Sequence, residues 1–153
     1  MSAISFTPDS RTIRASGRAL AVAVSFFAVC GAATAQTPVT ATVSVAPATG
    51  AAPAGVCTTT NNYYICVNPD PVKTAGAPGT DVKIVWKLTG AGWTFVKNKG
   101  IDIKNRKTWK LNEDSSTQYT ATNKREDGSQ IYKYEINVTN GSLTLPWDPT
   151  IMN

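Results

Sequence analysis

The chain has 153 residues with 15 Lys and Arg side chains, 10 Asp and Glu side chains and no histidine, which gives a net charge of +5. This charge falls short of the dense basic stripe of a nucleic-acid-binding protein. Because histidine is the commonest proton-transfer residue near neutral pH and the commonest zinc and copper ligand, its absence argues against an enzyme and against a bound metal or other cofactor.

The first 35 residues have the features of a signal peptide. Three arginines form a positive leading segment, an apolar run follows over 19–29, and Ala33-Thr34-Ala35 supplies the small residues of a cleavage site. The run is shorter than the roughly 20 residues that span a bilayer. Val29 stands before Cys30 where a lipid-attachment site requires a small residue, so export without a lipid anchor is favoured. We expect a periplasmic or secreted protein that does not span a membrane after this segment is removed.

Residues 36–56 are mainly Ala, Thr, Val, Pro and Gly and carry no charge. Because large apolar side chains are scarce, this composition predicts a flexible tether. Within it, residues 39–45 alternate Val or Ala with Thr or Ser, which is a strand pattern. The alternative is therefore an edge strand, either folded onto its own domain or donated to a neighbouring subunit as in pilus proteins.

Cys57 and Cys66 are the two cysteines that remain after residue 35, and in an oxidising compartment they are expected to form a disulfide. The midpoint between them falls at Asn61-Asn62, and asparagine tolerates the positive φ of a two-residue hairpin turn. Such a turn places the cysteines opposite each other at a non-hydrogen-bonded position, where Cα atoms approach to about 4.5 Å. We predict a stapled hairpin with a structural role.

Residues 81–88 give the strongest strand signal, because apolar and polar side chains alternate there with Val85 as the one exception. Trp86 is the largest side chain on the apolar side, so we place it at the centre of the core. Further strands are predicted over 93–96, 101–104, 108–111, 117–123 and 130–138, with a hairpin turn at Lys97–Gly100 and another turn at Asp127-Gly128.

This spacing of strands and turns predicts an all-β fold, a small antiparallel two-sheet sandwich over residues 57–153. A strand with Trp86, then the Asp127-Gly128 turn and a Tyr132-x-Tyr134 strand, resembles an immunoglobulin-like domain, although here the disulfide is local. The ending L-P-W-D-P-T-I-M-N is similar to that of small exported proteobacterial proteins that end in D-P-x-I-x-N. That resemblance implies a bacterial envelope or secreted protein and assigns no activity.

Basic side chains crowd residues 97–110, where Asp102 alone opposes them. They are candidate contacts for an anionic envelope component or an acidic protein. The alternative is a solvated face whose lysines discourage edge-to-edge aggregation. The cluster consists of Lys97, Lys99, Lys104, Arg106, Lys107 and Lys110.

Trp147 differs from the other tryptophans because it stands in the sequence P-W-D-P, which cannot join a central strand. We expect it to fold over one end of the sandwich, and it becomes a candidate contact residue if it is exposed. Glu113 and Asp114 are adjacent carboxylates that point apart in an extended chain, so they do not form a catalytic pair.

The sequence therefore favours a non-catalytic exported module that binds an unknown protein or an anionic envelope component. One alternative is a pilus-like subunit of a surface polymer that donates residues 39–45. Another is a small secreted hydrolase inhibitor, for which the size, the disulfide and the basic hairpin are the supporting features.

Overall fold

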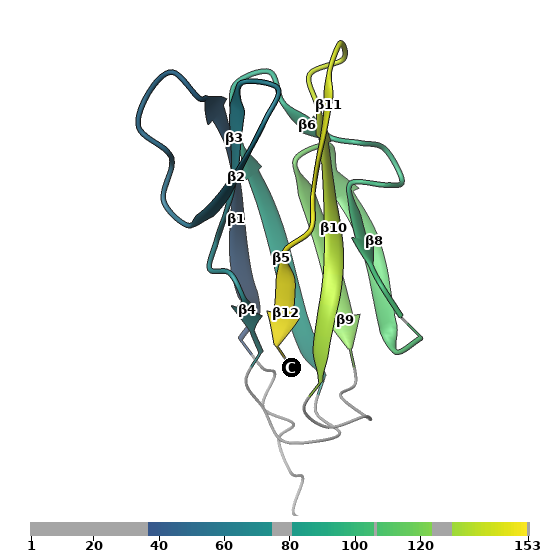
Figure 1. The fold of residues 1–153 in the computed structure, drawn as a ribbon. Coiled ribbons are helices and arrows are strands. Elements are labelled where there is room, and N and C mark those ends of the chain that lie inside the picture. The colour runs from purple at the N-terminus through teal and green to yellow at the C-terminus, as the bar shows by residue number, and fades with distance from the viewer. Residues whose placement is uncertain (1–36, 75–80, 106, 124–129, 153) are drawn as a thin grey trace, which may run out of the picture. The chain divides into compact units, whose positions relative to one another are not determined.

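The structure is a computed structural model that describes residues 37–74, 81–105, 107–123 and 130–152, and the elements it describes are strands (Figure 1). The signal peptide, Cys30, Arg106 and the Asp127-Gly128 turn lie outside these residues. Within the described ranges, no helix is long and apolar enough to cross a membrane.

The first sheet has six strands in the order β2-β3-β1-β5-β9-β8. Its strands are β1 (Val39–Pro47), β2 (Val56–Thr60), β3 (Tyr63–Asn68), β5 (Val82–Thr89), β8 (Trp109–Ser115) and β9 (Gln118–Asn123). Neighbouring strands are antiparallel except β1 and β5, which are parallel. The prediction of wholly antiparallel sheets is therefore wrong, and this sheet is mixed.

The second sheet is built around β10, whose two sides pair with different strands. β11 and β12 lie along one side, β6 and β7 lie along the other, and β4 adds parallel to β12. The strands are β4 (Val72–Lys73), β6 (Thr94–Phe95), β7 (Ile101–Ile103), β10 (Ile131–Thr139), β11 (Thr144–Trp147) and β12 (Thr150–Met152). The two sheets pack together, which confirms the predicted all-β sandwich.

Three pairs of aromatic rings join the two sheets, and a fourth joins β3 to the loop before β6. At the centre, Trp86 of β5 is fully buried and its ring centroid lies 5.4 Å from that of Tyr134 on β10. Such pairs add about 0.5–1.5 kcal/mol beyond the area that they bury. The other pairs are Tyr63–Trp93, Phe95–Tyr119 and Trp109–Tyr132. The prediction that Trp86 occupies the core is confirmed.

The prediction of a tether is wrong for residues 39–47, because β1 fills the middle of the first sheet between β3 and β5. Its inward side chains Ala41, Val43 and Val45 are at most 7% exposed. The strand alternative is confirmed in so far as residues 39–47 form a strand on their own domain, but its edge position is wrong, since both sides of β1 are paired. Small side chains suffice at this position because large ones from neighbouring strands fill the core, and composition alone does not reveal such partners.

The predicted hairpin at Lys97–Gly100 is wrong as well. β6 and β7 do not pair with each other; both run antiparallel to β10, with the intervening residues looped out. Asn137 of β10 bridges the gap, because its carbonyl accepts the Val96 N–H at 2.9 Å and its N–H donates to the Gly100 carbonyl at 2.8 Å. The segment is thus a wide bulge in one interrupted edge strand.

Candidate interaction surfaces

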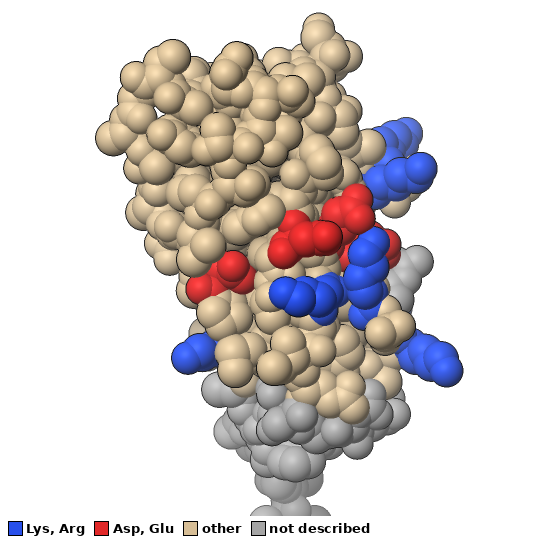
Figure 2. Space-filling model, in the orientation of Figure 1, with Lys and Arg blue, Asp and Glu red and all other residues tan. Residues whose placement is uncertain are grey.

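The described lysines of the basic cluster are all exposed, but acidic side chains from other strands lie among them. Glu113 comes from β8 and Glu135 from β10, and both approach the bulge between β6 and β7. Figure 2 shows acidic and basic side chains side by side on this face of the molecule. The cluster is therefore not an unopposed positive surface.

Lys104 is the most strongly engaged of these lysines. Its ammonium Nζ lies 3.3 Å from Asp102 Oδ2 and 2.9 Å from Glu135 Oε2. The hydrogen bond with Glu135, followed by that with Asp102, raises the pKa of Lys104. The Asn137 amide and then Lys104 lower the pKa of Glu135. Lys104 is thus already neutralised by its own chain and offers little charge to a partner.

Asp102 and Glu135 form a carboxylate pair that sequence reasoning missed, because the two residues are far apart in the chain and meet only as cross-strand partners. They line a depression of about 270 Å³ together with Asn98, Lys99 and Asn137. A general acid requires a carboxyl group with a raised pKa. Here the ammonium of Lys104 lies between the two carboxylates, and the pKa of Glu135 is lowered. The arrangement favours an ion-pair network over acid–base chemistry.

Tyr119 anchors the bulge from β9. Its buried hydroxyl accepts the Gly100 N–H at 3.3 Å and donates to Glu113 Oε2 at 2.7 Å. Burial, followed by the hydrogen bond with Glu113, raises the pKa of Tyr119 to about 12. The Asn98 N–H, at 2.7 Å, and then Tyr119 lower the pKa of Glu113. These groups fix the shape of the bulge.

Asp114 points to different partners from those of Glu113, as expected for adjacent residues in a strand. Its carboxylate accepts hydrogen bonds from the side chains of Thr120, Gln118 and Asn112. The Thr120 and Gln118 bonds are the main cause of its lowered pKa. Among the residues that the structure describes, no group of three or more His, Cys, Asp or Glu side chains is placed to hold a metal ion.

Trp147 does not fold over one end of the sandwich as expected. It lies in β11 opposite Ile136, half-buried against the core. Pro146 is tolerated because β11 is an edge strand that pairs with β10 on one side only. A shallow depression of about 380 Å³ is lined by Trp147 together with Glu135, Pro146 and Asp148. Since much of its ring packs inward, Trp147 is a weaker contact candidate than the sequence suggested.

One half of the first sheet differs from the charged surface around the bulge between β6 and β7, because residues 37–69 carry no charged side chain. This stretch includes β1, β2 and β3. The loops at the same end of the sandwich, residues 89–93 and 140–143, are uncharged too, and the upper part of the face in Figure 2 shows neither acidic nor basic side chains. We call this region, formed by 37–69 with the two loops, the uncharged half.

The predicted hairpin forms the outer edge of the uncharged half. Cys57 pairs with Cys66 in the expected register, and a disulfide joins them with a Cα separation of 4.0 Å. Asn61 and Asn62 adopt the positive φ values of 51° and 62° that the two-residue turn requires. β2 pairs with β3 and ends the sheet.

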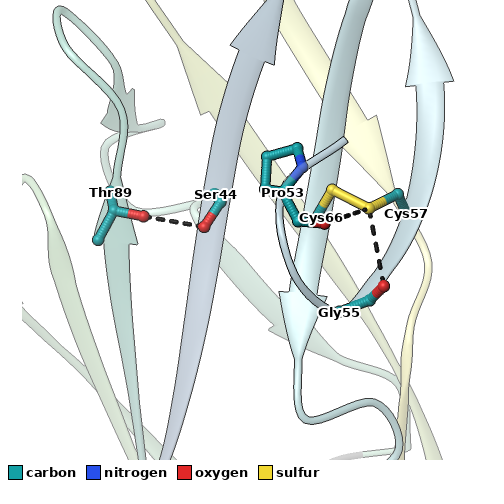
Figure 3. Close-up of a disulfide and its surroundings, with 6 residues drawn as sticks. All are labelled: Ser44, Pro53, Gly55, Cys57, Cys66 and Thr89. Carbon is teal, nitrogen blue, oxygen red and sulfur yellow. Dashed lines mark hydrogen bonds between the residues drawn. A yellow bond between two sulfur atoms is a disulfide. The ribbon is translucent and has the colours of Figure 1, made fainter. Parts of the chain in front are cut away.

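The loop between β1 and β2 packs on the outer face of this hairpin (Figure 3). Cys57 Sγ lies 3.5 Å from the Pro53 carbonyl oxygen and 3.8 Å from that of Gly55. A sulfur in a disulfide has no proton to donate, so these are close contacts and not hydrogen bonds. Gly55 has φ +118°, and a Cβ there would lie 2.2 Å from the Val67 carbonyl oxygen. Only glycine fits this approach to β3.

A scan against protein-family models finds no match to this chain, and a search of curated proteins finds no match either.

Proposed function

We propose that the protein is a non-catalytic interaction module, exported to the periplasm or the exterior of a bacterium, and that it binds through the uncharged half. One observation carries the proposal: the uncharged half ends in β2, an edge strand that carries no charged side chain and has no strand partner on its outer side among the described residues. Natural sheets usually protect such an edge with charge, proline or a bulge. An edge without these features is suited to strand addition by a partner.

Export is supported by the signal-peptide pattern of residues 1–35 and by the Cys57–Cys66 disulfide, because disulfides persist in oxidising compartments. An immunoglobulin-like arrangement is supported by Trp86 at the centre of one sheet and Tyr134 opposite it on the other. Both assignments belong to the proposal.

Each alternative loses one of the features that supported it. Donation of residues 39–45 to a neighbour would break the pairing of β1 with both β3 and β5. The hypothesis of a hydrolase inhibitor was supported in part by a basic hairpin at 97–100, and that segment is a bulge within a sheet edge. An anionic partner was inferred from the lysine cluster, in which Lys104 pairs with Asp102 and Glu135, and Lys97 lies near Glu113.

Site-specific photo-crosslinking in the producing bacterium tests the proposal. A photoreactive residue replaces Thr59, which is exposed on β2, and as a matched control replaces Lys110, which is exposed on β8 at the opposite edge. We expect covalent adducts from position 59 and none from position 110. Adducts from position 110 alone, whose yield falls when crosslinking is done in high salt, would favour the lysine cluster instead, and adducts from neither position would refute the proposal.

A further inference from the structure

We propose that the free edge of β2 pairs with β2 of a second copy of this chain, antiparallel about a two-fold axis at Thr58. The inference rests on the proposed function and names the partner of the same edge. It follows from three properties of β2: the direction of its backbone groups, its symmetry under self-pairing, and the charge around it.

The hairpin turn determines which backbone groups of β2 point outward. In an antiparallel pair, hydrogen-bonded and non-hydrogen-bonded positions alternate. Thr60 opposite Tyr63 closes the two-residue turn as a hydrogen-bonded pair, so Cys57 and Thr59 occupy non-hydrogen-bonded positions. The short Cα separation of 4.0 Å at Cys57–Cys66 agrees with this assignment. The N–H and C=O groups of Cys57 and Thr59 therefore point away from β3, where no backbone partner lies among the described residues.

These outward groups are spaced for self-pairing. With Thr58 on the two-fold axis, Cys57 of one copy faces Thr59 of the other, and the reverse holds by symmetry. Both positions then exchange N–H···O=C bonds, as a hydrogen-bonded antiparallel pair does. Thr58 faces its own symmetry mate at the intervening position, and cross-strand Thr–Thr pairs stabilise sheets.

Charge and burial also favour a second copy. After residue 35 the chain carries 12 basic and 9 acidic side chains, a net charge of +3, so two copies repel wherever lysines meet. β2, β3 and β1 carry no charge, and two copies approaching edge to edge meet no like charges. Val56, which faces Val67 on the inner side of the sheet, is 49% exposed, and a neighbouring β2 would cover part of it.

Light-scattering mass measurement of the full chain, as processed and purified from a bacterial host, tests the inference over a range of concentrations. Thr59→Pro removes an outward N–H without breaking the ladder with β3, and Thr59→Lys brings like charges together. Thr144→Lys, an exposed threonine on the edge strand β11 of the other sheet, is the matched control. Melting temperatures verify that all three variants fold.

We expect the wild-type mass to rise from one chain to two with concentration, and Thr144→Lys to behave alike. Either Thr59 variant is expected to raise the dimer dissociation constant by about tenfold or more. A wild-type chain that stays monomeric, or Thr59 variants that dimerise as the wild type does, would overturn the inference. If the chain is monomeric while position 59 crosslinks to another protein, the inference fails and the proposed function stands; if position 59 forms no adduct of either kind, both fail.

Discussion

The two edges of the first sheet are built in opposite ways. β8 carries Lys110, Glu113 and Asp114, and its register shifts at a bulge between Glu113 and Ser115. β2 has neither charge nor bulge. Charge and bulges are the features by which natural sheets discourage chance pairing. One edge thus carries these protective features and the other does not, and this difference is the basis of the proposal that β2 makes a specific contact.

The edges also differ in what holds them in place. β2 is held by a covalent bond between Cys57 and Cys66 and by the close approach of Gly55 to β3. β8 is held by side-chain hydrogen bonds, chiefly Tyr119 to Glu113 and Thr120 to Asp114. Substitutions at β2 should therefore test the disulfide and the glycine packing, whereas substitutions near β8 should test the side-chain hydrogen bonds.

The largest effect is expected for Gly55→Ala, which should lower the free energy of unfolding by about 2–5 kcal/mol, because the residue combines an unfavourable φ with overpacking. The added Cβ would lie 2.2 Å from the Val67 carbonyl oxygen. Chemical denaturation measures the change. Gly50→Ala, where nothing lies within 4 Å, is the control and should be nearly neutral. Equal stability of the two variants would show that the β1–β2 loop does not pack on β3 as described.

Replacement of both cysteines, Cys57→Ala with Cys66→Ala, should lower the free energy of unfolding by about 2–3 kcal/mol on the chain-entropy estimate for a short loop. The double variant should also weaken any contact made through β2 while leaving β8 unchanged. Denaturation and amide exchange check the two parts. Exchange that quickens equally at β2 and β8 would mean that the disulfide does not act locally.

Tyr119→Phe should cost about 1–3 kcal/mol, because the buried Gly100 N–H loses its acceptor. The lost hydrogen bonds lie near β8 and far from β3. The amides of residues 96–100 should therefore exchange faster, while those of β3 keep their protection. NMR-detected amide exchange measures both regions in one sample. Faster exchange confined to β3 would contradict the separation of the two edges.

Glu113→Gln should reduce the loss of stability in acid. Because the Asn98 N–H and Tyr119 lower the pKa of Glu113 below its usual 4.5, its ionised form stabilises the fold above that pH. This contribution is lost as pH falls from 4.5 through the lower value of the folded protein. Melting temperatures of the two proteins should therefore differ near neutral pH and converge in acid. A constant difference across this range would exclude the proposed hydrogen bonds to the carboxylate.

The smallest effect is expected for Lys104→Gln, since exposed ion pairs contribute little to stability. Its ammonium contacts Asp102 and Glu135 at the protein surface. The melting temperature should fall slightly at low salt and not at high salt. A large loss that persists in high salt would mean that the network fixes the bulge between β6 and β7.

Local patterns predicted the parts of the fold that local chemistry determines. The alternation over 81–88 placed Trp86 in the core, and the spacing from Cys57 to Cys66 gave the register of the hairpin, because a two-residue turn leaves one pairing available. The strands predicted over 117–123 and 130–138 also form, as β9 and β10.

Features that depend on distant partners could not be predicted. β1 pairs with β5 across some forty residues, and its small side chains give no local sign of a central position. The bulge at 97–100 looks like a hairpin until β10 is known to pair with both flanks. The pairing of Asp102 with Glu135 and the gathering of uncharged segments at one end also arise only in the folded chain.

Amide exchange at β2 as a function of protein concentration tests the central claim most directly. In dilute solution the Cys57 and Thr59 amides should exchange rapidly, whereas the Thr58 and Thr60 amides, paired with β3, should be protected. As concentration rises and the mass doubles, Cys57 and Thr59 should gain protection. Protection of these two amides already in the dilute monomer, or none in the associated state, would show that β2 is not the contact edge.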